Sequence, residues 1–330
     1  MIIARTPFRI SFFGGGTDYP DWYKENGGAV LCTSINKFSY ITARYLPPFF
    51  DYKYRIRYYQ REETKTISEI KHPSVKQCLT FLNFKDNLDL VHHADLPARS
   101  GLGSSSTFTV GLLHAISALQ SKMITKRELA INAINIEQNL IKESVGSQDQ
   151  TIAAFGGLNK IEFGGVNEFN VTPVVASHER INLLEGNLML FFTRLSRTAS
   201  DIASKQIESI PKKISQLKEM HLSVDEAISI LSSNQSIDDF GRLLGEQWKN
   251  KKMMSSLITN AEIDDIYAKG ISAGAIGGKL LGAGGGGFML FYVPKDRQKI
   301  VKDKLSNLLH VPFRFDHTGS QIVYYSERVN

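Results

Sequence analysis

The first half of the chain alternates short runs of Ile, Val, Phe and Tyr with polar or glycine-rich breaks, a pattern typical of β-strands. These runs predict strands at Ile2–Phe13, Ala29–Tyr45, Tyr52–Tyr59, Asn87–Asp95, Leu158–Phe163 and Phe169–Val175. Apolar residues at helical spacing predict helices at Val75–Phe84, Ser104–Leu119 and Lys126–Lys142, followed by a loop and short helix at Ser147–Phe155.

The second half is richer in helix formers. Between about Ser200 and Gly270 we predict four helices, near residues 200–209, 212–231, 236–252 and 261–272. Around them we predict strands at Leu188–Thr193, Phe288–Val293 and Val311–Asp316, and a helix at Asp296–Leu309. This mixed order indicates an α+β fold. A length of 330 residues fits two domains, which we place at residues 1–186 and 187–330.

Composition narrows the class of protein. The net charge of +6 is spread along the chain, which argues against nucleic-acid binding and leaves a solvated basic surface or a pocket for anionic substrates. The longest apolar runs, such as Phe288–Val293, are too short to cross a membrane. Cys32 and Cys78 form no disulfide framework, and the first ten residues lack a signal-peptide pattern. We therefore expect a cytoplasmic protein.

The loop Pro97-Ala98-Arg99-Ser100-Gly101-Leu102-Gly103-Ser104-Ser105-Ser106 lies between a predicted strand and a predicted helix. Its glycines allow a ligand to approach the backbone, and the N–H groups at the start of the helix can bind an anion. The serine hydroxyls can bind phosphate oxygens or Mg²⁺. The alternative is an ordinary helix start with a serine cap. No Gly-Lys-Ser/Thr follows, so the loop is not a Walker A motif, but it predicts a phosphate site.

Two further glycine runs carry candidate chemistry. Gly282–Gly287 matches G-x-G-x-x-G by letter, but it leads into a strand instead of a helix, so a dinucleotide-dependent dehydrogenase is disfavoured. We expect this backbone to pass very close to another loop or to a substrate. The run Gly14-Gly15-Gly16 ends a strand and leads to Asp18, which suits recognition of sugar hydroxyls. Asp18 could instead cap a helix around Trp22.

Taken together, the three glycine loops resemble the motifs of the GHMP kinases, a family that includes galactokinase, homoserine kinase, mevalonate kinase and phosphomevalonate kinase. The first motif resembles Thr6–Asp18, and the third resembles Lys279–Gly287. The second, P-x-x-x-G-L-G-S-S, is matched letter for letter by Pro97–Ser105. The resemblance implies a first domain like ribosomal protein S5 domain 2, a ferredoxin-like second domain, and the use of ATP and Mg²⁺.

Within that family the sequence is most similar to the D-glycero-D-manno-heptose 7-phosphate kinases, on Arg9–Tyr19, Val145–Gln150 and Phe155–Asn159. This implies phosphorylation of the anomeric C1 hydroxyl of a sugar phosphate, giving the 1,7-bisphosphate used in the biosynthesis of nucleotide-activated heptose. The implied partner is this small molecule, and we expect a monomer or homodimer that binds neither nucleic acid nor membrane.

The resemblance also implies roles for single residues. Asp149 matches the catalytic aspartate and Arg9 the arginine of the first motif, while Ser105 and Glu137 match the metal ligands. The ATP-binding residues would be Pro97, Arg99, Ser100, Gly101, Leu102, Gly103, Ser104, Ser105 and Ser106. The substrate-binding residues would be Gly16, Thr17, Asp18, Arg197, Gly284 and Gly285. Lys279 would serve either the packing of the third motif or a substrate phosphate.

Each role has a structural alternative. Asp149 could cap a helix at Thr151–Phe155, Glu137 could be a surface glutamate, and Arg9 could form a structural salt bridge. Other functions also stay open. Another hexose 1-kinase is possible, either fucokinase-like or galactokinase-like, although Gly14–Asp18 departs from the Gly-Glu-His-Thr-Asp of galactokinases. A non-catalytic sugar sensor is a further alternative, but a sensor would have no need of Asp149, Ser105 and Glu137.

Overall fold

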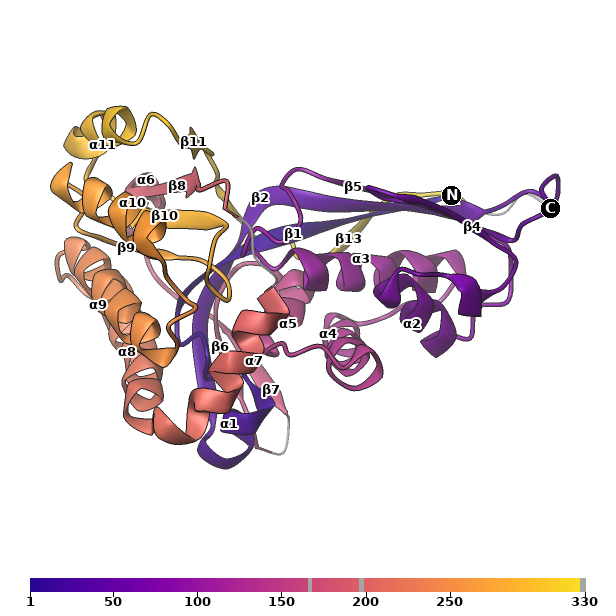
Figure 1. Cartoon of the computed structure of the whole chain (residues 1–330), viewed down its shortest axis with the longest axis horizontal. Coiled ribbons are helices and arrows are strands. Elements are labelled where there is room, and N and C mark those ends of the chain that lie inside the picture. Colours follow the sequence, from indigo (N-terminus) through magenta and orange to yellow (C-terminus); the bar gives the residue numbers. More distant parts are fainter. Residues whose placement is uncertain (166–167, 196–198, 327–330) are drawn as a thin grey trace.

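The computed structural model describes residues 1–165, 168–195 and 199–326 and contains two β-sheets, each covered by helices (Figure 1). The strands are β1 Ile2–Phe13, β2 Gly28–Tyr45, β3 Tyr54–Arg57, β4 Arg61–Thr64, β5 Leu88–Ala94, β6 Leu158–Phe163, β7 Phe169–Pro173, β8 Leu188–Phe192, β9 Gly277–Leu280, β10 Phe288–Tyr292, β11 Leu309–His310, β12 Phe315–Asp316 and β13 Gln321–Tyr325. The α-helices are α1 Pro20–Asn26, α2 Pro73–Phe81, α3 Ser104–Leu119, α4 Lys126–Asn135, α5 Gln148–Phe155, α6 His178–Gly186, α7 Ala199–Ser209, α8 Ile214–Ser232, α9 Asp238–Met254, α10 Ala261–Ser272 and α11 Gln298–Lys304. Among the described residues, no helix has the length and apolar character needed to span a bilayer.

The larger sheet is built on the long strand β2. Its first part, Gly28–Thr33, pairs with β6, and its last part, Ser39–Tyr45, pairs with β5. The strand order is β13-β1-β2-β5-β3-β4, with β6, β7 and β12 attached through β2, and only the β3–β5 pair is parallel. β1 and β2 therefore extend through both halves of the molecule (Figure 1).

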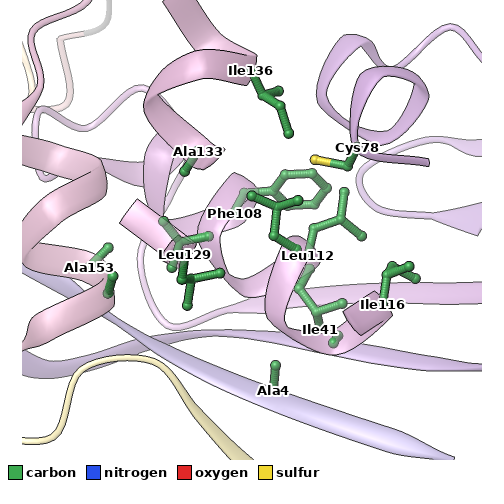
Figure 2. Close-up of a cluster of buried hydrophobic side chains, with 14 of the residues drawn as sticks. Ala4, Ile41, Cys78, Phe108, Leu112, Ile116, Leu129, Ala133, Ile136 and Ala153 are labelled. Atoms are coloured by element: carbon green, nitrogen blue, oxygen red, sulfur yellow. The ribbon is translucent and has the colours of Figure 1, made fainter. Parts of the chain in front are cut away.

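Helices α2, α3, α4 and α5 cover one face of this sheet and enclose the first core. Figure 2 shows Phe108 and Leu112 of α3 between the sheet residue Ile41 and the helical residues Leu129 and Ile136. α3 is apolar on nearly every side and 12 of its 16 residues are buried, as expected for a helix between a sheet and a second layer of helices. This packing fixes the N-terminus of α3, where the serine-rich loop begins.

The smaller sheet has the order β11-β8-β10-β9 and lies against the end of β1. The two ends of β1 belong to different cores: Ile2 and Ala4 lie in the first, and Phe8, Ile10 and Phe12 lie in the second. The second core also holds residues of α8, α9 and β10. The two sheets therefore share the second core, in which the end of β1 packs against the smaller sheet.

Most of the predicted elements are confirmed, and Ile2–Phe13 and Ser104–Leu119 have the predicted bounds. The predicted helix Asp296–Leu309 was too long, because the chain leaves it after Lys304 and pairs Leu309–His310 with β8. The predicted strand Val311–Asp316 was also wrong over most of its length, since only Phe315–Asp316 is a strand. The missed elements include β4, β9, β11, β13, α1 and α6.

The domain division at residue 186 remains a prediction. The smaller sheet and most of its helices follow residue 186, but β12 and β13 return to the larger sheet, where they pair with β2 and β1. The end of the described chain therefore completes the first sheet.

Candidate active site

The second and third glycine loops touch each other. Gly101 has a φ of +79° and Gly282 a φ of +77°, in the left-handed region that favours glycine. A Cβ on Gly101 would lie 2.4 Å from the carbonyl oxygen of Leu281, and a Cβ on Gly282 would lie 2.4 Å from the Cα of Gly101. The close approach expected for the third loop is therefore confirmed, and its neighbour is the serine-rich loop.

Arg9, near the middle of β1, ties this contact to the acidic residue of α5. Its Nε donates to Oδ1 of Asp149 at 2.7 Å, and its Nη2 donates to Oδ2 at 2.6 Å. Its Nη1 donates to the carbonyl oxygen of Gly101 at 2.7 Å. The Arg9 side chain is 5% exposed and that of Asp149 is 23% exposed, so the carboxylate is the member of the pair that can reach a ligand.

Behind this pair begins α3, with Gly103 as its N-cap in the left-handed conformation. The first helical residues, Ser104, Ser105 and Ser106, expose backbone N–H groups that have no partner within the helix. Gly103 lies against Asp149, because a Cβ built on it would be 3.3 Å from Oδ2 of that carboxylate. The start of the helix and the Arg9–Asp149 pair therefore face the same space.

Asp18 is the second carboxylate of the site. It is 2% exposed, and its Oδ1 accepts a hydrogen bond from the backbone N–H of Gly16 at 3.0 Å. Burial raises the pKa of Asp18, and the negative charge of Asp149 raises it further, while the Gly16 hydrogen bond opposes both effects. The residue preceding α1 is Tyr19, and no side chain caps that helix, so the alternative of Asp18 as a helix cap is wrong.

Glu137 is completely buried in a π-helical turn, Ile136–Ile141, that continues α4. Its Oε2 accepts hydrogen bonds from Ser106 Oγ at 2.7 Å and from the amide of Gln150. Its Oε1 has no hydrogen-bond partner of good geometry among the described residues, although the nearby Thr109 hydroxyl helps to stabilise the charge. Burial raises the pKa of Glu137 to about 7. The alternative of a surface glutamate is therefore wrong.

Apart from Glu137, which is buried behind Ser106, these groups line one cavity of about 300 Å³, within the size range of small-molecule sites. Residues from all three glycine loops meet there with others from α5, α7, α9 and β9, and the lining includes Ser11, Gly15, Tyr19, Glu143, Gln148, Gln206, Lys251, Lys279, Gly282 and Ala283. The arrangement brings the carboxylates of Asp18, Glu143 and Asp149, several cations and a helix N-terminus around a space large enough for a sugar phosphate.

Comparison with known proteins decides the family. The model of the GHMP kinases N terminal domain matches residues 73–157, and that of GHMP kinases C terminal matches residues 226–311. The D-glycero-alpha-D-manno-heptose 7-phosphate kinase of Campylobacter jejuni is 31% identical over 314 residues, covering 91% of this chain and 92% of the relative. The chain belongs to the GHMP kinase family. GHMP kinases use ATP to phosphorylate a hydroxyl group, so this chain is a phosphotransferase with an alcohol group as acceptor.

Two further relatives support the GHMP kinase assignment. The crystal structure of a D-glycero-D-manno-heptose 1-phosphate kinase from Bacteroides thetaiotaomicron matches with a TM-score of 0.80 at 26% identity, covering 99% of this chain and 100% of that one. The L-fucokinase/L-fucose-1-P guanylyltransferase of Bacteroides fragilis is 27% identical over 350 residues, covering 92% of this chain and 35% of that protein. The predicted two-domain GHMP kinase fold is confirmed. Membership in this family favours an enzyme over a sugar sensor or a dehydrogenase.

In this GHMP kinase the structure brings most of the predicted site residues to the cavity. Those that line it are Arg9, Gly16, Asp18, Arg99, Gly101, Gly103, Ser104, Ser105, Ser106 and Asp149. Asp149 lies in the first turn of α5, and its carboxylate pairs with Arg9 instead of capping the helix. Arg9 does form a salt bridge, as its structural alternative proposed, but its partner is Asp149, so the contact is compatible with the predicted catalytic role.

Six of the predicted ATP-binding and substrate-binding residues lie elsewhere. Leu102 is packed in the second core, and Ser100 is buried beneath the third glycine loop, while Pro97 also lies outside the cavity lining. Thr17 donates its hydroxyl to backbone carbonyl groups within the fold. Gly284 and Gly285 contact Ile258 and do not line the cavity. A seventh, Arg197, lies outside the described residues.

The structure also adds residues that sequence reasoning missed. Gln148 accepts a hydrogen bond from Ser11 Oγ at 2.8 Å through Oε1, which connects the first glycine loop to α5. Its position next to Asp149 was a signal for it. Lys251 reaches the cavity from α9, at a position where the helix is otherwise apolar. Gln206 of α7 comes close to Gly16, and nothing in the local sequence indicates this contact.

Proposed function

We propose that this protein is an ATP-dependent kinase that phosphorylates the anomeric C1 hydroxyl of D-glycero-D-manno-heptose 7-phosphate. The observation that carries the proposal is the Arg9–Asp149 pair at the N-terminus of α3, in the same cavity as Asp18. A base, an anion site and a polar acceptor pocket are what phosphoryl transfer to a sugar requires. The names of the relatives from Campylobacter jejuni and Bacteroides thetaiotaomicron support a heptose phosphate as the acceptor.

In the proposed reaction, the anomeric hydroxyl gives its proton to Asp149 while its oxygen forms a bond to the γ-phosphorus of ATP. The bond between that phosphorus and the oxygen bridging to the β-phosphate breaks, and ADP leaves with the electron pair. Arg9 holds both oxygens of Asp149 through two hydrogen bonds, which fixes the direction of the carboxylate. An anomeric hydroxyl is more acidic than other sugar hydroxyls, which makes proton removal easier.

The nucleotide phosphates would bind the loop from Gly101 to Ser106. Unpartnered N–H groups at the start of a helix and the positive end of the helix dipole both favour an anion. Because α3 has 16 residues and is held in the first core, these groups are fixed before the nucleotide arrives. Asp18, on the first glycine loop, would contact a hydroxyl of the acceptor.

The chemistry of the residues fits a magnesium ion beside this loop. Glu137 has one carboxylate oxygen without a good protein partner, and Ser106 links the carboxylate to the loop. Ser105, the predicted hydroxyl ligand, is exposed at the cavity. Bound Mg²⁺ supplies positive charge that neutralises the phosphate oxygens. Glu137 and Ser105 would hold the ion, and Ser106 would orient the carboxylate.

A second candidate acceptor is a free hexose. The match to the fucokinase-containing protein of Bacteroides fragilis favours this class, since it covers nearly the whole of this chain. Both candidates share the proposed attack of an anomeric hydroxyl, and they differ in whether the acceptor already carries a phosphate.

The test is to incubate the protein with ATP, Mg²⁺ and either heptose 7-phosphate or a free hexose such as L-fucose or D-galactose. We expect ADP release with the heptose phosphate and a new 1-phosphate ester in the ³¹P spectrum. Preference for a free hexose would support the second candidate. No phosphorylated sugar in any reaction would refute the kinase proposal.

Asp149→Asn tests the assigned base. We expect kcat to fall by about 100-fold or more, because the amide cannot accept the proton, while the Kd for Mg-ATP changes little. The matched control is Asp296→Asn, whose carboxylate is 74% exposed and distant from the cavity lining. Unchanged turnover in Asp149→Asn would remove Asp149 from the reaction.

A further inference from the structure

Two lysine ammonium groups are buried at the wall of the cavity, Lys279 on strand β9 and Lys251 on helix α9. Lys279 is 2% exposed, and its Nζ donates to the carbonyl oxygens of Ser11 at 3.0 Å and Phe12 at 2.8 Å. Lys251 is 7% exposed, and its Nζ donates to the carbonyl oxygens of Gly282 and, at 3.4 Å, Leu280. Both side chains line the cavity.

Counting hydrogen-bond donors leaves one N–H on each lysine. An ammonium group has three donors, and each of these lysines uses two on backbone carbonyl groups. Within the described ranges, no carboxylate lies within 4.0 Å of either Nζ. A buried lysine is rare unless it is paired with an anion.

The two charges also oppose each other. Burial lowers the pKa of Lys279 well below its usual value, and the positive charges of Lys251 and Arg9 lower it further. Burial likewise lowers the pKa of Lys251 to about 8, and Arg9 adds to that effect. The negative charges of Asp18 and Asp149 partly offset this effect on Lys251, but neither carboxylate forms an ion pair with it, since Asp149 pairs with Arg9 and Asp18 accepts backbone hydrogen bonds.

We propose that Lys251 and Lys279 together bind one phosphate group inside the cavity. This inference rests on the proposed kinase function, and it assigns a second anion site apart from the serine-rich loop. A phosphate dianion would accept the remaining donor of each lysine and would offset both charges. Its source is either the phosphate already on the acceptor sugar or the γ-phosphate of ATP, which share this chemistry.

The alternative is a purely structural role. Lys251 bridges α9 to the third glycine loop, so it could hold that loop in place without binding a ligand. The two roles predict different results for anion binding, because a structural lysine contributes to the free energy of unfolding but not to the affinity for phosphate.

The first experiment measures the binding of inorganic phosphate to the protein without nucleotide or sugar, by calorimetric titration at constant ionic strength. Lys251→Met and Lys279→Met keep the length of the side chain and remove the charge. We expect each to weaken phosphate binding by at least about tenfold, because a buried charged partner is lost. The control is Lys249→Met, an exposed position on the same helix, which should bind like the wild type.

Unchanged phosphate affinity in both lysine variants would overturn the proposal. Wild-type protein that binds no phosphate would overturn it as well. If one variant fails to fold, which its circular dichroism spectrum would reveal, the other still tests the site. Because this readout involves no turnover, it stands even if the proposed kinase activity is not found.

Steady-state kinetics then identify the source of the phosphate. If the acceptor supplies it, Lys251→Met should raise KM for heptose 7-phosphate by about tenfold or more and leave KM for ATP unchanged. If the γ-phosphate occupies the site, kcat or KM for ATP should change for phosphorylated and free sugars alike. A variant with wild-type values for every substrate would contradict both assignments.

Discussion

The contact between two glycine loops makes a quantitative prediction that depends on the structure alone. Gly101→Ala would place a Cβ 2.4 Å from the carbonyl oxygen of Leu281, where an ordinary contact between carbon and oxygen is about 3.3 Å. The matched control is Gly165→Ala. Gly165 has a φ of +78°, against +79° for Gly101, and no atom of the described residues lies within 4 Å of its added Cβ. The two variants therefore share the same backbone strain and differ in the steric conflict.

The expected magnitudes follow from these two terms. A left-handed alanine costs roughly 1–2 kcal/mol, and the loss of glycine entropy in the unfolded chain returns about 0.4–1 kcal/mol in both variants. Gly101→Ala must also separate two backbones by almost an ångström, a conflict that typically costs about 1–3 kcal/mol. We therefore expect the free energy of unfolding to be about 1–3 kcal/mol lower for Gly101→Ala than for Gly165→Ala in urea titrations.

The same displacement should impair the proposed reaction, because Gly101 also accepts a hydrogen bond from Arg9. A shift of about 1 Å in a positioned group can lower the rate by about 100-fold, so kcat/KM should fall far more for Gly101→Ala than for the control. If the two variants agreed within about 0.5 kcal/mol in stability and about twofold in kcat/KM, the loops would not be in contact as described.

Two other substitutions test the charged groups. Arg9→Lys should lower kcat by at least about tenfold, because lysine cannot form the two parallel hydrogen bonds to Asp149. A pH–rate profile with kcat unchanged would contradict the assigned role of Arg9 in orienting Asp149. Burial alone would raise the pKa of Asp89, but hydrogen bonds from Arg55 and Arg44 outweigh it and lower the pKa to about 2. The resulting stability is present above the unfolded pKa of 3.8 and is lost as the pH falls through 2. Asp89→Asn should therefore lower the free energy of unfolding by roughly 2 kcal/mol at pH 7 and by less near pH 2, while kcat stays unchanged. Equal urea midpoints for this variant and the wild type at pH 7 would argue against the prediction.

Much of the fold could be predicted because its long elements have clear periodicity. Ser104–Leu119 is apolar over four turns, and Ile2–Phe13 ends at the glycine run Gly14–Gly16. The missed strand Gly277–Leu280 contains two glycines and a lysine, which are poor strand formers, and it forms because β10 pairs with it. The missed strand Gln321–Tyr325 pairs with β1, more than 300 residues earlier, and local pattern carries no information about such a partner.

The candidate site shows the same division between local and distant information. The resemblance to the family motifs identified Arg9, Asp18, Gly101 and Asp149, because each stands in a short stretch of sequence that matches the family. The burial of Glu137 follows from helical spacing, since it lies four residues after the buried Ala133 on the same face of the helix. The partners of its carboxylate, Ser106 and Gln150, come from α3 and α5, and the local pattern carries no information about them.

Lys251 also carried a signal within its own helix. Phe240, Leu244 and Trp248 are buried at helical spacing along α9, and a further step of three residues reaches Lys251 on the same face. A lysine on a buried helix face conflicts with the pattern that folds the helix, and such conflicts persist where another requirement outweighs the cost. The helix alone does not reveal that requirement. The third glycine loop explains the buried lysine, because a carbonyl group of this loop holds the Lys251 ammonium at the wall of the cavity. Lys279, the second buried lysine of this wall, also lacks an anionic partner among the described residues.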